Sequence, residues 1–270
     1  MIADFNEIEG FANECFDIAN GAAATIQFSL NASRARYSKS AGEGRQEPYL
    51  IGNQPQFAEL DTAFGMAAYS VILSVDLRRS SKRAVEVGAK HTYLTMHTYL
   101  PVMAELVTRA SGKIVGLRGD GLFAAFGLTK LVGTGKEVTI EVAHAAMKNA
   151  TRCGKGMLEA TADIINPLLN RNGIRGDLAI GVGISVGEVV VTRIGLGDAN
   201  EVTVYGPAVN QACKLCSKTT GVALTGSAWD TYPTSSGGKM KFDSIEGGGV
   251  RAVFPPGFVM LPREKPRWPR

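Results

Sequence analysis

The chain has 270 residues, of which 45% are hydrophobic and 20% charged, a balance typical of a globular protein with a hydrophobic core. The formal net charge of +4 is too small and too scattered to indicate a nucleic-acid-binding protein, although it suits a polyanionic small molecule. The start lacks the basic and apolar regions of a secretory signal, and no apolar run reaches the ~20 residues of a membrane span, so we expect a cytoplasmic protein.

The first part of the chain combines helical spacing of apolar residues with one polar interruption. The spacing predicts one or two helices in residues 1–30, and a polar, glycine-containing loop follows over 31–48. A short helix is predicted over about 55–67. The next run, 69–77, is almost wholly apolar and β-branched, which is typical of a strand buried on both faces.

A long helix and a hairpin are predicted next. Ser80 and Ser81 are favourable N-cap residues for a helix that continues to about Ala110 and bends at Pro101. Residues 113–126 contain two apolar runs around a Gly-Asp-Gly turn, and Asp-Gly between such runs is a strong hairpin signal.

The second half of the chain repeats this alternation. A helix is predicted over about 137–170, and residues 177–194 are predicted to form a second hairpin that turns at Val186 and Gly187. A strand over 201–205 and a helix over 207–218 follow. The order β-α-β-β-α-β-β predicts an α+β fold, with helices packed against a mostly antiparallel sheet.

Two acidic residues stand where this topology can bring them together. Asp76 ends the first strand, and Asp120 lies in the glycine-flanked turn of the first hairpin. Two adjacent carboxylates can bind a pair of divalent metal ions, as nucleotidyl transfer requires. Gly119 and Gly121 leave room for a triphosphate to approach the backbone. The residues alone leave open that Asp120 serves only the turn.

Basic residues follow Asp76 at the start of the predicted long helix: Arg78, Arg79, Lys82 and Arg83. Cations at a helix N-terminus oppose the helix dipole, whereas free backbone N–H groups there bind phosphate. A bound polyphosphate therefore explains these residues better than helix stability does. A solvated basic face remains the alternative.

Four motifs, in the same order along the chain, resemble those of class III adenylate/guanylate cyclase catalytic domains. They occupy residues 75–81, 113–126, 180–190 and 204–214, within a similarity that extends from about Tyr69 to Val253. The resemblance implies a ferredoxin-like core (βααββαβ) and a head-to-tail homodimer with active sites shared across its interface. It also implies that Asp76 and Asp120 hold two Mn²⁺ or Mg²⁺ ions, with the backbone carbonyl of Leu77 as a further ligand.

The same resemblance assigns roles around the substrate, and it shows departures. Asn210 matches the residue that orients the ribose, and Lys214 stands in place of an arginine that stabilises the transition state. Lysine keeps the charge but loses the two-pronged geometry. Gly116 and Thr203 occupy the two positions that usually select the purine, and Gly116 has no side chain for that purpose. The remaining residues expected to bind the substrate are Arg78, Arg79, Ser80 and Ser81.

The absent purine reader, the N-terminal extension and the compact length resemble the pyrimidine cyclases of bacterial Pycsar anti-phage systems. This implies conversion of UTP or CTP to the 3′,5′-cyclic monophosphate, with UTP favoured, and a separate effector that binds the product. Tyr49 is a candidate to stack on the base, although an ordinary half-buried tyrosine also fits. The alternatives are an adenylate cyclase that makes cAMP, and a degenerate cyclase-homology domain that only binds nucleotide or dimerises.

We expect residues 1–66 to form an N-terminal helical extension and loop, 67–256 the catalytic domain and 257–270 a C-terminal tail. Cys213 and Cys216 form a Cys-x-x-Cys pair inside a predicted helix, and no second ligand pair accompanies them. Packing therefore explains these two cysteines better than zinc binding or redox chemistry. Arg118, next to the Gly-Asp-Gly turn, either contacts phosphate or points into solvent.

Overall fold

The computed structural model describes residues 2–25, 50–53, 57, 60, 64–130, 140–196, 199–233, 239–246 and 248–262. Its strands are β1 (Gly65–Leu77), β2 (Lys113–Arg118), β3 (Gly121–Lys130), β4 (Ile180–Leu196), β5 (Ala199–Tyr205), β6 (Gly221–Leu224), β7 (Lys241–Ser244) and β8 (Val250–Val253). Its helices are α1 (Phe5–Thr25), α3 (Ser80–Arg109), α4 (Ile140–Glu159), α5 (Asn166–Arg171), α6 (Pro207–Lys218) and α7 (Gly226–Asp230), with a 3-10 turn η1 (Ile51–Asn53) and a π-helix η3 (Ala160–Ile165).

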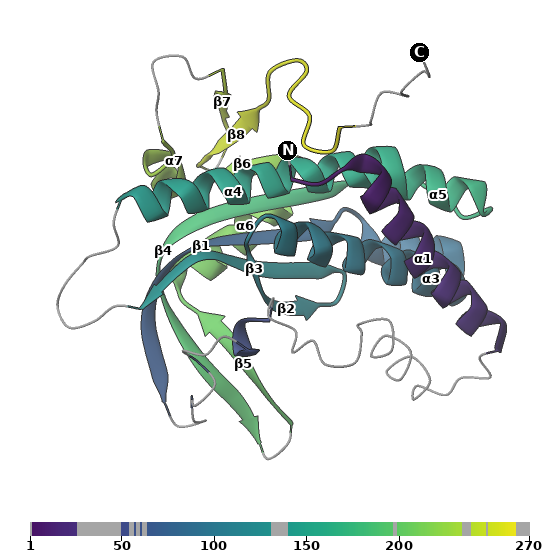
Figure 1. The fold of residues 1–270 in the computed structure, drawn as a ribbon, viewed down its shortest axis with the longest axis horizontal. Helices are drawn as coiled ribbons and strands as arrows, with labels where there is room; N and C mark the ends of the chain where they lie inside the picture. The colour runs from purple at the N-terminus through teal and green to yellow at the C-terminus, as the bar shows by residue number, and fades with distance from the viewer. Residues whose placement is uncertain are drawn as a thin grey trace, which may run out of the picture.

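The described strands form one eight-stranded sheet in the order β2-β3-β1-β4-β6-β8-β7, with β5 paired to β4. All pairs are antiparallel except β4 with β6. Figure 1 shows α4 lying along the sheet, α1 beside α3, and the β4–β5 hairpin extending away from these helices. The predicted α+β fold is therefore confirmed.

The central strand β1 places its side chains alternately on two hydrophobic clusters, as the two-residue period of a strand requires. Val71, Leu73 and Val75 belong to the cluster that includes α1, α3 and α4. Ile72 belongs to the cluster on the other face, which includes α6 residues and the buried Ile51. Because Asp76 is four residues after Ile72, it shares the face toward α6.

Helix α1 belongs to the main hydrophobic core. Ile8, Ala12 and Phe16, at helical spacing, are almost completely buried and α1 packs against α3. The two ends of the described chain also meet, since the amide of Ile2 donates to the carbonyl of Met260 over 3.1 Å. Figure 1 shows the N-terminal and C-terminal segments on the same side of α4.

The carboxylate of Glu159 fixes the C-terminal segment in place. It accepts hydrogen bonds from the amides of Met260 (2.9 Å) and Leu261 (2.8 Å), and Lys155 pairs with it at 3.2 Å. Met260 and Leu261 are buried. Met260 and Leu261 are therefore fixed against the helix that carries Glu159, and Leu261 belongs to the main core.

Two predictions about strands were wrong. The expected turn at Val186 and Gly187 is absent, since β4 runs through both residues and pairs them with Val71 and Ser70 of β1. The β-branched residues on either side favour a continuous strand, and an added Cβ at Gly187 would make only an ordinary contact, 3.7 Å from Cβ of Ala208. Strand β1 begins at Gly65, where a helix was expected, and most of residues 54–63 lie outside the described chain.

Helix α3 also differs from expectation at its start and at its bend. Its N-cap residue is Arg79, with no side-chain cap, rather than Ser80 or Ser81. Its interruption lies at Gly88, whose φ of 77° is outside the helical region, and not at Pro101. Glycine tolerates a positive φ at little cost, so the helix breaks there. In the described part of the chain, no helix is long and apolar enough to cross a bilayer.

Candidate active site

Asp76 and Asp120 lie side by side at one end of the sheet. Val75 pairs with Leu122, so the end of β1 adjoins the β2–β3 turn that carries Asp120. An ideal Cβ on Gly121 would lie 3.2 Å from Oδ1 of Asp76 and 3.1 Å from the carbonyl oxygen of Val75. A glycine at this position therefore lets the turn approach the Asp76 carboxylate closely.

The two carboxylates affect each other electrostatically. Burial and the neighbouring charge of Asp120 raise the pKa of Asp76, and Arg78 opposes this effect. Oδ2 of Asp120 is buried, and no described group hydrogen-bonds to it. A buried carboxylate oxygen without a donor is costly, and a bound cation would satisfy it. Two converging acidic groups with an unsatisfied oxygen fit a divalent metal.

The described residues supply few side-chain ligands beyond this pair. Among them, no group of three or more His, Cys, Asp or Glu side chains is arranged to hold a metal. Leu77, whose backbone carbonyl was predicted as a ligand, follows Asp76 directly and pairs with Ile180. Further oxygen ligands would come from this backbone, substrate phosphates or water, as is usual for Mg²⁺.

Arg78 extends from the Asp76–Asp120 carboxylate pair toward the end of α6. Its Nη2 lies 3.5 Å from Oδ2 of Asp76, and its Nη1 donates to the carbonyl of Ser217 over 2.7 Å. The side chain is 18% exposed, and its Nε is buried with no partner in the described chain. Arg78 thus brings a positive charge to the edge of the carboxylate pair.

Arg79 starts α3 with a strained backbone. Its φ of 56° and ψ of 29° lie in the left-handed region, which costs a non-glycine residue about 1–2 kcal/mol. Its side chain is exposed, and no ion pair to another described residue involves it. Strained backbone of this kind is often found at functional sites. Ser80 and Ser81 follow in the first turn of α3, where backbone N–H groups have no intrahelical partner.

A cleft of about 490 Å³ opens beside this helix start. Its lining residues are Arg78, Arg79, Lys82, Arg83, Glu86, Arg175, Asp177, Leu178, Ala179 and Thr220. Five of these are basic and two are acidic, so the cleft favours anions. The predicted phosphate-binding residues Arg78 and Arg79 both line it. Arg83, by contrast, is buried and paired with Asp177 at 2.8 Å.

The two predicted base-selecting residues lie on strands that a single ion pair connects. Arg118 of β2 lies 3.6 Å from Glu201 of β5. Gly116 is two residues before Arg118 on β2, and Thr203 is two residues after Glu201 on β5. Each therefore shares a strand face with the ion-paired residue of its own strand. A Cβ added to Gly116 would meet nothing within 4 Å, whereas Thr203 is buried. The structure therefore brings these strands together around open space at Gly116.

A segment of the N-terminal extension lies next to this space. Leu50 forms a parallel bridge with Ile114 of β2. An added Cβ on Gly52 would lie 3.3 Å from Cβ of Val202, the neighbour of Thr203. The segment thus reaches both strands. Tyr49, the predicted base-stacking residue, lies outside the described residues.

Asn210 and Lys214 lie one turn apart on α6 and are both exposed. Lys214 also lines a cavity of about 440 Å³ with Gln211, Lys218 and the α7 start. Cys213 and Cys216 of α6, by contrast, face the strand of Asp76, where both thiols form hydrogen bonds with Ser74. Burial raises the pKa of Cys216 to about 11, which suits a packing role for this thiol.

Comparison with known proteins finds similarity to nucleotide cyclases. No protein-family model matches the chain. A curated cytidylate cyclase of Escherichia coli is 30% identical over 171 residues, which are 62% of this chain and 36% of that protein. The chain therefore spans only about a third of the length of this relative.

Solved structures of cyclases align with a larger share of the chain. The crystal structure of the guanylyl cyclase Cya2 aligns with a TM-score of 0.56 at 23% identity, covering 74% of this chain and 100% of that one. The adenylyl cyclase CyaB from P. aeruginosa aligns with a TM-score of 0.54 at 18% identity, covering 70% and 94%. The chain has the fold of a class III cyclase catalytic domain. The resemblance inferred from the motifs is confirmed at this level.

Within the class III cyclase fold, sequence reasoning missed several residues around the predicted site. Arg175 and Asp177 line the cleft but stand in a loop whose sequence carries no recognisable motif. Gly181 was noticed only as part of a motif, although a Cβ there would lie 3.1 Å from Cζ of Arg78. The bridge formed by Leu50 was also missed, since a single extended residue has no periodic signal.

Proposed function

We propose that this chain is a nucleotidyl cyclase that converts a pyrimidine nucleoside triphosphate to its 3′,5′-cyclic monophosphate. The observation that carries the proposal is the pairing of Asp76 with Asp120, whose buried Oδ2 has no partner among the described residues. In the reaction, the 3′-oxygen forms a bond to the α-phosphorus and the bond to the β-phosphate oxygen breaks. Pyrophosphate leaves, and the hydroxyl proton passes to solvent.

The chain's own residues then have distinct tasks. Asp76 and Asp120 would hold Mn²⁺ or Mg²⁺, with the carbonyl of Leu77 as a further ligand. Such ions activate the attacking hydroxyl and neutralise charge on the transferring phosphoryl group. Arg78 and Arg79, with the N–H groups of Ser80 and Ser81, would bind the β- and γ-phosphates in the basic cleft.

A pyrimidine is favoured by the space around Gly116. This position has no side chain to read a purine edge. The Leu50–Asn53 segment contacts both β2, which carries Gly116, and β5, which carries Thr203. A base placed between this segment and the two strands would have less room, which would favour a pyrimidine, and Tyr49 directly precedes the segment in the sequence. Thr203, buried on β5, would hydrogen-bond the base. UTP remains our first choice, while the curated similarity to a cytidylate cyclase supports CTP.

We propose that the active unit is a head-to-tail homodimer. Asn210 and Lys214 are exposed on α6, and their neighbours Cys213 and Cys216, not they, face the strand of Asp76. A partner copy would therefore receive Asn210 for ribose orientation and Lys214 for charge on the α-phosphate. The β4–β5 hairpin supports such an interface through its exposed apolar side chains, Val190, Ile194, Leu196 and Tyr205.

The direct test is incubation of the purified chain with ATP, GTP, CTP or UTP and Mn²⁺, followed by product mass determination. We expect cyclic UMP or cyclic CMP, with at least tenfold less product from either purine. Faster conversion of ATP would make the chain an adenylate cyclase and contradict the pyrimidine assignment. No product from any of the four would favour a nucleotide-binding or dimerisation domain instead.

Complementation tests the shared site. Asp76→Asn and Asn210→Ala should each abolish product formation, because each homodimer then lacks one essential group in both sites. Mixing the two variants should restore about a quarter of wild-type activity, since mixed dimers carry one intact site. Failure of every mixture to recover activity would contradict sharing of the site between two copies.

We further propose a signalling role in anti-phage defence, in which a separate cyclic-nucleotide-binding effector reads the product. The curated similarity to a cytidylate cyclase supports this suggestion. Cells that express the chain should accumulate a cyclic pyrimidine nucleotide during phage infection. Unchanged levels after infection would contradict this role and leave the enzymatic proposal intact.

A further inference from the structure

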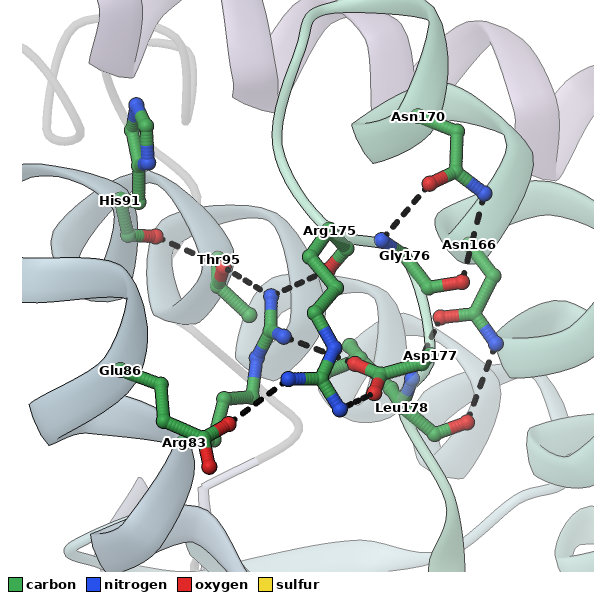
Figure 2. Close-up of polar contacts among 10 residues, drawn as sticks. All are labelled: Arg83, Glu86, His91, Thr95, Asn166, Asn170, Arg175, Gly176, Asp177 and Leu178. Atoms are coloured by element: carbon green, nitrogen blue, oxygen red, sulfur yellow. Dashed lines mark hydrogen bonds and ion pairs between the residues drawn. The ribbon is translucent and has the colours of Figure 1, made fainter.

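We propose that Arg83 is a positioning residue that fixes the phosphate-binding start of α3 through ion pairs with the loop before β4. This inference rests on the proposed function, because it assigns a task to residues that flank the same cleft. Figure 2 shows the arrangement, in which Arg83 and Glu86 of α3 meet Arg175 and Asp177 of that loop.

The need for such a device arises from the break at Gly88. The helical backbone geometry of α3 is interrupted there, since Gly88 has a φ of 77° and a ψ of 170°. The segment Ser80–Val87, which carries the free N–H groups at the helix start, is therefore not rigidly continuous with the rest of α3. Its position must come from other contacts.

Arg83 provides these contacts from a buried position. Its side chain is 10% exposed, and its Nη1 lies 2.8 Å from Oδ1 of Asp177. Its Nη2 donates to the carbonyl oxygen of Arg175 and, over 3.5 Å, to Oγ1 of Thr95 beyond the break. One guanidinium thus connects the helix start, the loop and the main part of α3.

A second pair strengthens the connection. Arg175 donates to the carboxylate of Glu86 over 2.7 Å and also pairs with Asp177. Lys82 lies 3.8 Å from the other oxygen of Glu86. Isolated surface ion pairs contribute little, but a network around a buried arginine holds a defined geometry. Two turns of the helix start are therefore bound to one loop.

The loop itself is held rigidly by two asparagines. Asn166 accepts from the amide of Leu178 over 2.8 Å and donates to its carbonyl over 3.0 Å. Asn170 does the same for Gly176, at 2.8 and 3.3 Å. Figure 2 shows both amide pairs beside the ion-pair network. A loop fixed at two residues is a firm support for Arg83.

Loss of Arg83 should therefore loosen the helix start without disturbing the carboxylate pair. The effect on phosphate binding is measured by calorimetric titration of the full chain with inorganic pyrophosphate at saturating Mn²⁺. We expect Arg83→Met to weaken pyrophosphate binding at least tenfold and Arg83→Lys, which keeps the positive charge for Asp177, to weaken it by less. Mn²⁺ affinity should stay within twofold of wild type. Amide hydrogen exchange over residues 80–87 should accelerate in Arg83→Met.

Arg109→Met is the matched control. Arg109 lies at the other end of α3 and pairs with Glu105 at 2.7 Å and with Glu7. Its loss should leave pyrophosphate affinity within twofold of wild type. If Arg83→Met does not fold, Asp177→Asn tests the same connection, with an expected loss of at least threefold.

The outcomes separate the two proposals. Unchanged pyrophosphate affinity in folded Arg83→Met, or an equal loss in Arg109→Met, would overturn the positioning role alone. If wild-type protein bound neither Mn²⁺ nor pyrophosphate, the proposed function would fail, and this inference with it.

Discussion

The guanidinium of Arg78 fills the space that a side chain on Gly181 would need. An ideal Cβ on Gly181 would lie 3.1 Å from Cζ of Arg78, and 2.4 and 2.5 Å from the carbonyl oxygens of Cys216 and Thr219. Gly181 thus lets β4 approach the end of α6 and lets Arg78 pass between them to Ser217. Gly181, the cross-strand partner of Asp76 in the β1–β4 pairing, therefore shapes the charge beside the carboxylates.

Gly181→Ala should therefore destabilise the protein and displace Arg78. We expect a loss of about 1–3 kcal/mol in the free energy of unfolding, the range found when a packed site is overfilled. Gly10→Ala is the control, since a Cβ there meets nothing within 4 Å and the residue lies inside α1. Alanine in a helix interior should add about 0.5–1 kcal/mol. Urea denaturation measures both, and equal stability of the two variants would contradict the packing argument.

Arg79→Gly should increase stability and reduce phosphate binding. Relief of left-handed strain, about 1–2 kcal/mol, exceeds the added entropy of the unfolded chain, about 0.4–1 kcal/mol. Ser111 is a matched control, because it also has a positive φ (62°) but lies in the turn between α3 and β2. Ser111→Gly should give a similar gain in thermal denaturation with unchanged pyrophosphate affinity. A loss of affinity in both variants would contradict a phosphate contact by Arg79.

Gly116→Glu should leave the fold intact and impair the enzyme. The open space at Gly116 admits a side chain, so the melting temperature should change little. The new carboxylate would occupy the proposed base pocket, and turnover of UTP and CTP should fall at least tenfold. Leu117→Glu places the same group on the neighbouring residue, which is 56% exposed, and should retain activity. Full activity in Gly116→Glu would place the base elsewhere.

Ile8→Ala tests whether α1 stabilises the cyclase fold. Ile8 is completely buried in the main core, so its truncation should cost about 2–5 kcal/mol in the free energy of unfolding. Asp17→Ala changes an exposed residue of the same helix and should stay within about 0.5 kcal/mol of wild type. Denaturant titrations measure the free energy of unfolding of both variants. A loss of less than about 1 kcal/mol for Ile8→Ala would mean that α1 is peripheral.

Sequence periodicity predicted the parts of the fold whose cause is local. The β-branched run before Asp76 and the Asp-Gly turn at Asp120 were enough to predict β1, β2 and β3, because strand burial and turn geometry are encoded within a few residues. The same reasoning failed at Gly187. Gly187 lies within β4, paired with Ser70 of β1, yet in sequence it looks the same as a glycine in a turn.

The surroundings of the carboxylate pair were predictable only in part. Charge at the helix start indicated a phosphate site, but it did not distinguish exposed Arg79 from buried Arg83. Arg83 differs because it pairs with Asp177, which lines the same cleft but is 94 positions away from Arg83 along the chain. The strained backbone of Arg79 was equally hidden, since nothing in the residue type arginine indicates a positive φ.

Binding of Mn²⁺ tests the central claim that Asp76 and Asp120 form a metal site. Calorimetric titration should show binding to wild type and its loss, by at least a hundredfold in affinity, in Asp76→Asn and in Asp120→Asn. Without metal, both variants should be at least as stable as wild type, because burial and the neighbouring charge of Asp120 raise the pKa of Asp76 and each variant removes one of the two charges. Mn²⁺ affinity unchanged in both stable variants would contradict the account.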